Sequence, residues 1–239
     1  MLDHLAASGS ISAYFVRSGM GRMYAFEFDE VKTIARVSVE HMKDRGQVLV
    51  GTTGIWDRNY NRRPDRAPFT RQAVELSRFA ESIGAAGCVH TLPEAIKPEK
   101  GETADDVTRR YFEAISQAVS IPVLIYQPPG TRPEYCMTPE LLRELAALPN
   151  VTAMKASTAD AGFITDMIWA TRDRSFAYIV GHEMAWLAGL LLGARAVIGG
   201  GVCVNPGLLA RVESSYHNGD LAEALDAQRA VNHLCETLV

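Results

Sequence analysis

The sequence predicts an α/β fold of the (β/α) barrel class, and three features lead to this prediction. Short apolar segments that suit buried parallel strands occur seven times, and each is followed by a segment that suits a helix. This even alternation favours a barrel over a doubly wound sheet. A nucleotide-binding sheet would need a phosphate fingerprint after its first strand, and the turn Ser18-Gly19-Met20-Gly21 lacks that spacing.

The bulk composition fits a single domain that covers residues 1–239. The chain has 47% hydrophobic and 22% charged residues, which are ordinary values for a globular protein with one large core. Its net charge of -4 argues against a nucleic-acid surface, which needs a basic stripe. No apolar run is long enough to cross a bilayer. We therefore expect neither nucleic acid nor a membrane as a partner.

The N-terminus and the cysteines indicate a compartment. Asp3 and His4 stand where a secretory signal would carry positive charge, so no export is expected. The four cysteines lie far apart and suit thiols in a reducing compartment; they are Cys88, Cys136, Cys203 and Cys235. These observations predict a cytoplasmic protein.

The first unit is expected to contain a short helix, a strand and a longer helix. Residues 2–7 suit the short helix and residues 11–16 the strand. After a glycine-rich turn, the longer helix begins near Asp29 and ends near Lys43. Its acids stand at the start and its bases at the end, as the helix dipole favours.

The remaining units repeat this order of strand, loop and helix. The next elements are a strand at 48–50, an arginine-rich loop at 57–68, a helix from about 70, a strand at 88–90, a loop at 92–101 and a helix capped by Thr103. Then follow a strand at 121–126, a helix starting at Thr138-Pro139, a strand at 151–155, a helix from 160, a strand at 177–180, a helix from about 183, a strand at 196–198, and helices at about 206–217 and 220–237.

Two of these strands end on reactive side chains. The strand at 121–126 ends on Tyr126, and the strand at 151–155 ends on Lys155. Because parallel strands share one carboxyl end, we expect the phenol and the amine to emerge together, where they can make and process an imine. Burial in an apolar strand would lower the pKa of Lys155 and expose its lone pair.

Structural explanations exist for both residues. Lys155 could be a lysine that reaches from a barrel rim into solvent. Tyr126 could be a core aromatic residue whose hydroxyl bonds to the backbone. Both alternatives compete with the catalytic interpretation.

A family resemblance rests on segments in a characteristic order. The segment 121–130 (Ile-Pro-Val-Leu-Ile-Tyr-Gln-Pro-Pro-Gly), the lysine strand 151–155, Gly181 and the glycines 199–201 resemble the dihydrodipicolinate synthase / N-acetylneuraminate lyase family. The likeness runs from about residue 5 to the C-terminus. It implies a (β/α)8 TIM-barrel fold, pyruvate-type class I aldolase chemistry with no cofactor or metal, and a homo-oligomer, either a dimer or a tetramer.

The resemblance also implies roles for individual residues. Lys155 matches the family's Schiff-base lysine, and Tyr126 matches the tyrosine that moves protons beside it. Gly181 and Ile198 match backbone positions that line the substrate cleft. Arg132 lies near the position of an arginine that binds a substrate carboxylate, with a register that differs by one residue.

The turn expected to bind the keto-acid carboxylate departs from the family pattern. The family has glycine-Thr-Thr-glycine there, whereas this chain has Gly19 and Met20 at the two threonine positions. Their backbone amides remain to bind the carboxylate, but both hydroxyls are lost. The motif itself is spelled by residues 51–54, after the following strand.

Other departures concern the proton relay and the barrel wall. Glu94-Ala95 stand in place of the family's tyrosine pair, and Ala156 replaces an acidic residue after the lysine. Relative to the family the first strand is absent, and the C-terminal helices are shortened to an extension near 220–237. Seven strands leave two edges of the sheet uncovered, which predicts oligomerisation or poor solubility.

Two further groups of residues suggest alternatives. Cys88, His90 and His182-Glu183 could bind zinc in a metal-dependent aldolase, although a buried thiol and a rim histidine explain them as well. The loop containing Trp56 and Tyr60, with Arg58, Arg62, Arg63 and Arg66, could cover an anionic substrate or be a solvated surface loop.

These observations predict a lyase in which Lys155 forms a Schiff base with pyruvate or another 2-keto acid. The imine would serve aldol cleavage or condensation, or a dehydration. The altered turn and relay favour an alternative, a catalytically impaired barrel that binds a keto acid or a partner. Dihydrodipicolinate synthesis itself is not expected, because the relay of those enzymes is incomplete.

Overall fold

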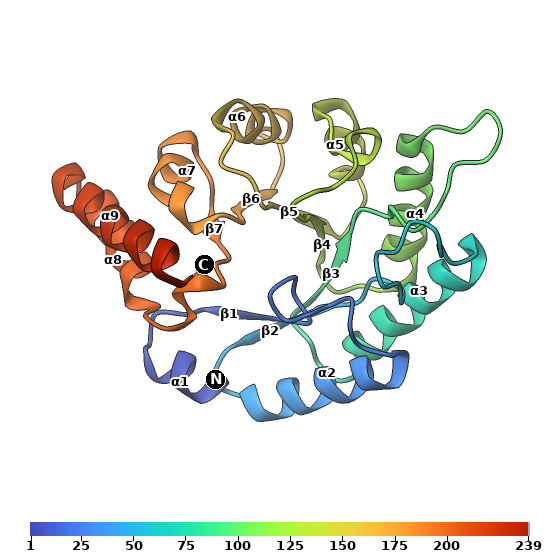
Figure 1. Ribbon diagram of the computed structural model, residues 1–239, viewed down its shortest axis with the longest axis horizontal. Helices are drawn as coiled ribbons and strands as arrows, with labels where there is room; N and C mark the ends of the chain where they lie inside the picture. Colours follow the sequence, from blue (N-terminus) through green and yellow to red (C-terminus); the bar gives the residue numbers. More distant parts are fainter. Residues whose placement is uncertain (239) are drawn as a thin grey trace.

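The protein is a curled sheet of seven parallel strands with helices on its outer side. The computed structural model describes residues 1–238. Neighbouring strands pair in sequence order, all in parallel. They are β1 (Ala13–Val16), β2 (Gln47–Gly51), β3 (Gly87–Thr91), β4 (Val123–Gln127), β5 (Val151–Ala156), β6 (Ala177–Val180) and β7 (Ala196–Val197). This half-barrel confirms the fold class that the sequence predicts (Figure 1).

One helix precedes the first strand, and the others separate the strands or follow the last one. They are α1 (Leu2–Ala7), α2 (Phe28–Met42), α3 (Arg66–Ser82), α4 (Ala104–Ala118), α5 (Pro139–Leu145), α6 (Ala161–Ala170), α7 (Trp186–Leu192), α8 (Gly207–His217) and α9 (Leu221–Leu238). Three short 3-10 helices are η1 (Pro133–Tyr135), η2 (Glu183–Ala185) and η3 (Gly201–Cys203). Helices α8 and α9 form the expected C-terminal extension beside α7 (Figure 1).

Local signals explain where several helices begin. Thr103 accepts a hydrogen bond from the amide of Asp106, and Thr138 caps the helix that starts at Pro139. Both starts confirm the sequence prediction. The expected start of α3 near residue 70 was wrong, because the helix begins at Arg66. Pro68 is tolerated in its first turn, where a backbone N–H has no intrahelical acceptor.

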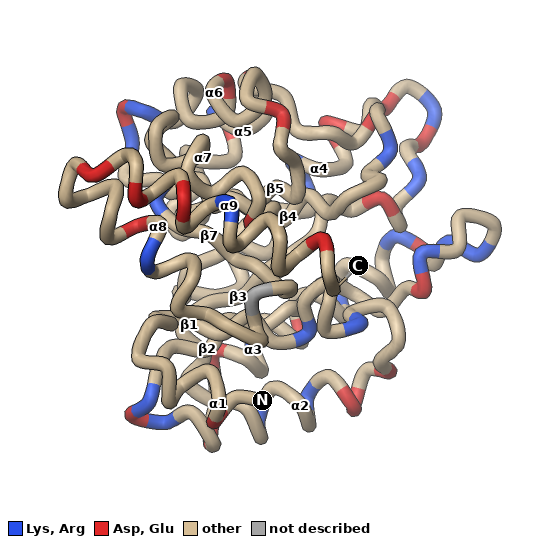
Figure 2. The backbone as a smooth tube through the Cα atoms, turned by 60° about the vertical axis from the view of Figure 1, so that its left-hand side comes forward, with Lys and Arg blue, Asp and Glu red and all other residues tan. Residues whose placement is uncertain are grey.

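The two faces of the sheet bury different clusters of apolar side chains. The face turned toward the helices packs into two large clusters, and the concave face carries a smaller one. Alternate residues of each strand point to opposite faces. The concave cluster includes Val89, Leu124, Tyr126, Ala153 and Ile179. Figure 2 shows that charged residues gather on loops and helices, while the strands are mostly uncharged.

The ends of the sheet, β1 and β7, are not paired to each other within residues 1–238. Loop contacts nevertheless cross between them. The Nε2 atom of His4 lies 3.3 Å from the carbonyl oxygen of Val204. At the carboxyl end, the side chain of Met20 packs on Gly200, where an added Cβ would lie 2.5 Å from Met20 Cγ. The loops after β1 and β7 therefore meet at the carboxyl end of the sheet.

No helix within residues 1–238 combines the length and the hydropathy that crossing a membrane would need.

Candidate active site

Lys155 lies on β5 with its side chain on the concave face of the sheet. Strand pairing places it next to Tyr126 of β4. Its Nζ lies 4.3 Å from the centroid of the Tyr126 ring and 5.8 Å from that of Phe15. The residue is only 6% exposed. The amine is therefore enclosed by two aromatic rings near the carboxyl end of the sheet.

Burial changes the protonation of this amine. Desolvation lowers the pKa of Lys155 to about 8, and the charge of Glu183 opposes that shift. At neutral pH about a tenth of such an amine is neutral, compared with less than about a thousandth of an ordinary lysine. The buried strand end thus supplies the nucleophilic form that imine chemistry requires.

Tyr126 stands beside Lys155 with its hydroxyl close to Ser157. The two hydroxyl oxygens are 3.4 Å apart. Desolvation raises the pKa of Tyr126, while Ser157 and Arg58 act in the opposite direction. The phenol is therefore a proton donor at neutral pH. Ser157 was not singled out from the sequence, although residues 153, 155 and 157 alternate onto one face of an extended segment.

Glycines make room for both reactive side chains. A Cβ on Gly181 would lie 2.8 Å from Cε of Lys155 and 2.6 Å from the carbonyl oxygen of Ala156. A Cβ on Gly19 would lie 2.9 Å from the hydroxyl oxygen of Tyr126. Both glycines therefore lie against the two reactive side chains, and a side chain at position 181 would also collide with backbone.

Two further residues of the expected cleft come from the edges of the sheet. Ile198 donates its amide to the carbonyl of Val180 and packs against the concave cluster. Met20 follows β1, and its side chain is 74% exposed above Gly200. The structure thus brings the loops of β1, β6 and β7 around Lys155. Carboxylate binding by the amides of Gly19 and Met20 stays a prediction.

Arg132 lies at the outer rim of this end. Its guanidinium carbon is 4.0 Å from the centroid of the Tyr60 ring. Its Nη1 is 3.5 Å from a carboxylate oxygen of Glu134. The arginine whose charge acts on the pKa of Tyr126 is Arg58, which lowers it. The Arg132 side chain is therefore stacked on Tyr60 of another loop. Its carboxylate-binding role stays a prediction.

Glu94 joins three loops at the same end of the barrel. Its side chain is 3% exposed. It accepts hydrogen bonds from the Tyr60 hydroxyl at 2.6 Å and the Arg132 amide at 2.9 Å, and Arg58 Nη2 lies 3.3 Å away. The arginine-rich loop is therefore tied down over the strand ends. The sequence pointed to Glu94 only as a departure from the family pattern.

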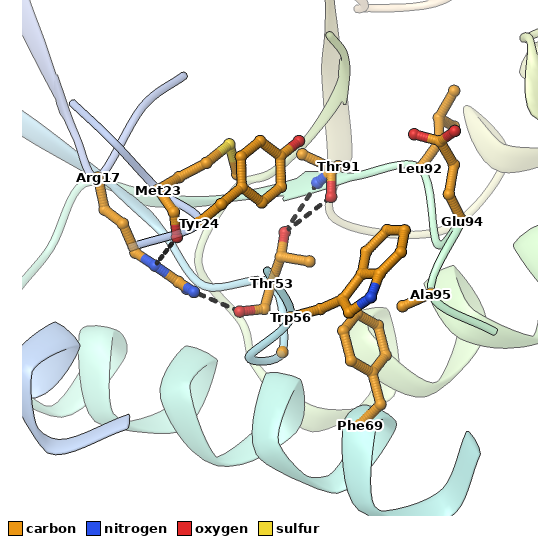
Figure 3. Close-up of a pocket in the computed structure, with 11 residues that line it drawn as sticks. Arg17, Met23, Tyr24, Thr53, Trp56, Phe69, Thr91, Leu92, Glu94 and Ala95 are labelled. Atoms are coloured by element: carbon orange, nitrogen blue, oxygen red, sulfur yellow. Dashed lines mark hydrogen bonds between the residues drawn. The ribbon is translucent and has the colours of Figure 1, made fainter. Parts of the chain in front are cut away.

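A small pocket lies beneath this loop, beside Tyr24, Thr53, Thr91 and Glu94 (Figure 3). Its volume is about 10 Å³, which is room for about one water molecule. Arg17 also lines it and donates hydrogen bonds to the carbonyls of Gly51, Thr53 and Met23. Hydroxyl and charged groups from the loops after β1, β2 and β3 converge there, together with apolar side chains such as those of Trp56 and Phe69.

The residues proposed for a zinc site have other partners. His90 faces the helices, with Nε2 2.9 Å from the Thr52 hydroxyl and Nδ1 2.9 Å from that of Tyr111. Both ring nitrogens are therefore engaged in hydrogen bonds. Cys88 is buried, and burial raises the pKa of its thiol to about 12. Within residues 1–238 no three His, Cys, Asp or Glu side chains are grouped to hold a metal ion.

Comparison with known families decides the relationship. The Dihydrodipicolinate synthetase family matches residues 1–239. The chain belongs to the dihydrodipicolinate synthetase family. This confirms the resemblance that the tyrosine strand, the lysine strand and the closing glycines indicated.

Two relatives are 29% and 26% identical to the chain over the residues that align. A 4-hydroxy-tetrahydrodipicolinate synthase of Nitrosomonas eutropha is 29% identical over 212 residues, which cover 89% of this chain and 64% of the synthase. YagE of Escherichia coli, named provisionally as a 2-dehydro-3-deoxy-D-gluconate aldolase, is 26% identical over 227 residues, covering 94% of this chain and 68% of YagE. The chain spans less than two thirds of the length of the first synthases it matches, 64% and 63%.

Solved structures of the dihydrodipicolinate synthetase family share the fold. The crystal structure of YagE in complex with pyruvate superposes with a TM-score of 0.79 at 25% identity, covering 95% of this chain and 71% of YagE. An N-acetylneuraminate lyase from Mycoplasma synoviae superposes with a TM-score of 0.78 at 16% identity, covering 97% and 71%. At 16% identity the likeness concerns the fold alone.

Proposed function

We propose that the chain is a Schiff-base lyase in which Lys155 reacts with pyruvate or a related 2-keto acid. The observation that carries this proposal is the buried amine of Lys155, with the Tyr126 ring 4.3 Å from its Nζ. A pKa lowered to about 8 keeps a useful fraction neutral. Membership of a family with synthase and aldolase members supports the same reaction class.

The first half of the reaction builds the imine. The neutral amine of Lys155 attacks the keto carbon, and the resulting carbinolamine carries one hydroxyl. Tyr126 donates its phenolic proton to that hydroxyl, which leaves as water and gives the imine. The protonated imine is an electron sink, so a proton can leave the adjacent carbon to give an enamine. Aldol cleavage, aldol addition or loss of a β-hydroxyl can proceed through this intermediate.

The substrate carboxylate is placed by the loops around Lys155. In our proposal the backbone amides of Gly19 and Met20 bind it, and Gly181 and Ile198 shape the cleft. Arg132 would bind a second carboxylate only after leaving the Tyr60 ring. The structure of YagE with pyruvate, at 25% identity, supports a 2-keto acid as the ligand. Each hydroxyl lost from the turn removes about 1.5–3 kcal/mol of binding to a charged group.

Borohydride trapping tests the proposal. The protein is incubated with pyruvate and borohydride, and the reduced adduct is located by mass spectrometry of peptides. We expect one adduct on Lys155, none in Lys155→Ala and an undiminished yield in Lys43→Ala, which removes an exposed lysine. A panel of other 2-keto acids then ranks substrates. If no 2-keto acid is trapped on Lys155, the lyase proposal fails.

The altered carboxylate turn favours one second candidate, a barrel that binds a keto acid without turnover. Gly19 and Met20 carry no hydroxyl at the turn, and Glu94 replaces an expected tyrosine. Calorimetry separates the candidates, because a binder takes up pyruvate without forming a trapped adduct. A metal-dependent aldolase would instead lose activity to a chelator and be indifferent to borohydride.

The uncovered strands β1 and β7 support a further part of the proposal, that the chain works as a homo-oligomer, a dimer or a tetramer. We also propose a cytoplasmic location. Sedimentation of the purified chain tests the first statement, and a stable monomer at micromolar concentration would contradict it.

A further inference from the structure

A second tyrosine, Tyr24, approaches the site from the loop after β1. Buried Arg17 donates hydrogen bonds to the carbonyls of Met23 and Thr53, at 3.3 Å and 2.7 Å, and so fixes the end of this loop. Met23 is 2% exposed within the concave cluster that contains Tyr126. Half-buried Tyr24 packs against the same cluster. A phenol from a different loop therefore stands near Tyr126.

The hydroxyl of Tyr24 is available for proton transfer. It makes no hydrogen bond to another residue in the described part of the chain, and its ring lines the water-sized pocket on the side of Thr91 (Figure 3). Thr91 of β3 is the pairing partner of Tyr126 of β4. Desolvation raises the pKa of Tyr24 to about 12, and a charge on Tyr126 acts in the same direction. Tyr24 is thus a protonated phenol that packs against the cluster containing Tyr126 and lines a water-sized pocket.

Arg58 is positioned to act on both phenols. Its guanidinium carbon lies 5.5 Å from the centroid of the Tyr24 ring. Hydrogen bonds hold it there, one to the Pro129 carbonyl at 3.1 Å and one to Glu94 at 3.3 Å. Its backbone has a φ of 61°, a left-handed conformation that is costly for a residue with a side chain. Its charge opposes the rise in pKa of both tyrosines.

We propose that Tyr24 is the proton-relay residue that serves Tyr126, and that Arg58, held by Glu94, positions and stabilises it. This inference rests on the proposed Schiff-base function. After Tyr126 has given its proton to the departing hydroxyl, Tyr24 returns a proton to the Tyr126 oxygen, directly or through a water molecule. Tyr24 then takes a proton from solvent. The relay runs in reverse when Tyr126 accepts a proton from the carbon next to the imine.

This arrangement explains why Glu94 stands where the family resemblance leads one to expect a tyrosine. The second phenol comes from the loop after β1 instead. Glu94 holds Arg58 against that phenol and, through Tyr60, fixes the loop that carries Arg58. The relay is therefore rebuilt from other loops, and Glu94 is a positioning residue in it.

Exchange of the methyl protons of pyruvate with deuterium oxide tests the relay, because it needs only imine and enamine. Exchange is followed by proton NMR, and borohydride trapping on Lys155 is measured in parallel. For Tyr24→Phe we expect trapping within about twofold of the parent and exchange slowed by about 10- to 100-fold, which lies at and below the lower end of the range for direct proton-transfer catalysis because Tyr24 acts through Tyr126. Tyr216→Phe, on α8, is the matched control and should change neither.

Each outcome decides the question. Unchanged exchange in Tyr24→Phe overturns the relay, and so does an equal loss of trapping and exchange, since a purely structural role would lower both. Absence of trapping in the parent protein removes the Schiff-base function itself and the relay with it. A second pair of variants does not depend on Tyr24: Arg58→Lys should keep most of the exchange rate, and Arg58→Gln should lose about tenfold. Equal rates for these two would also overturn the proposal.

Discussion

Two buried polar groups, Lys155 and His90, lie on opposite faces of the same sheet. Lys155 of β5 points into the concave side, and His90 of β3 points toward helices α3 and α4. Both are almost completely shielded from solvent. His90 is hydrogen-bonded to Thr52, Ser77 and Tyr111. The structure shows no hydrogen bond or ion pair from the Lys155 amine to any residue from 1 to 238; two aromatic rings lie beside it, and the charge of Glu183 acts on it from a distance.

The contrast shows how burial serves structure in one place and reactivity in the other. Desolvation lowers the pKa of His90 to about 3 and that of Lys155 to about 8. Both groups are pushed toward their neutral forms. The neutral histidine uses its nitrogens in hydrogen bonds, whereas the neutral lysine keeps a lone pair that a carbonyl carbon can accept. A buried polar group without partners is a candidate for chemistry, and a satisfied one for stability.

The largest effect is expected from removing the amine. Lys155→Met should abolish trapping of pyruvate, because no other amine within residues 1–238 occupies this site. Methionine has a similar length and no charge, so the protein should remain folded. Mass spectrometry of the trapped adduct measures the first effect, and circular dichroism the second. Trapping at full yield in this variant would place the reaction at another lysine.

Tyr126→Phe should have the next largest effect. It removes the hydroxyl but keeps the ring beside the Nζ of Lys155. Loss of a positioned proton donor slows such steps by about 10²- to 10⁴-fold, so we expect a slower approach to the same final adduct. Stopped-flow or timed trapping gives the rate. Ser157→Ala, which removes the hydroxyl 3.4 Å away, provides a milder comparison and should slow the reaction by less.

His90→Leu tests the other face of the sheet. It removes the common hydrogen-bond partner of Thr52, Ser77 and Tyr111, although Ser77 keeps its bond to the Ala73 carbonyl. A buried polar group left unsatisfied costs about 1–3 kcal/mol. We expect a net loss of about 2–4 kcal/mol in the free energy of unfolding, measured with urea. Trapping per folded molecule should not change. A large loss of trapping in fully folded His90→Leu would mean that the two faces are coupled.

The sequence predicted strand order and the lysine–tyrosine pair because both depend on local patterns. Apolar strands and helix caps mark the units, and a residue at a strand end must point to the carboxyl end of a parallel sheet. Tyr24 and Ser157 were missed because their positions depend on how loops fold after the strands. Arg132 was assigned by register alone. It is held at the rim by stacking on Tyr60, which belongs to a different loop far away in the sequence, and no local pattern encodes such a contact.

The smallest expected effect is a pH-dependent change in stability, and it tests the desolvation of Lys155 directly. An unfolded lysine holds its proton to a pKa of about 10.5, and the folded one only to about 8. Between these values the unfolded state binds more protons, so the stability of the folded protein rises with pH. Below pH 8 both states are protonated and the full cost of about 3 kcal/mol is present.

Lys155→Met is the reference for this measurement, because other titrating groups cancel in the difference. At pH 7 the variant should be more stable than the parent by up to about 3 kcal/mol, and the gap should shrink to about 1 kcal/mol near pH 10. Urea unfolding at both pH values measures it. A gap that does not change with pH would show that the amine is hydrated in the folded protein, and Lys155 would then lose the property that separates it from an ordinary surface lysine.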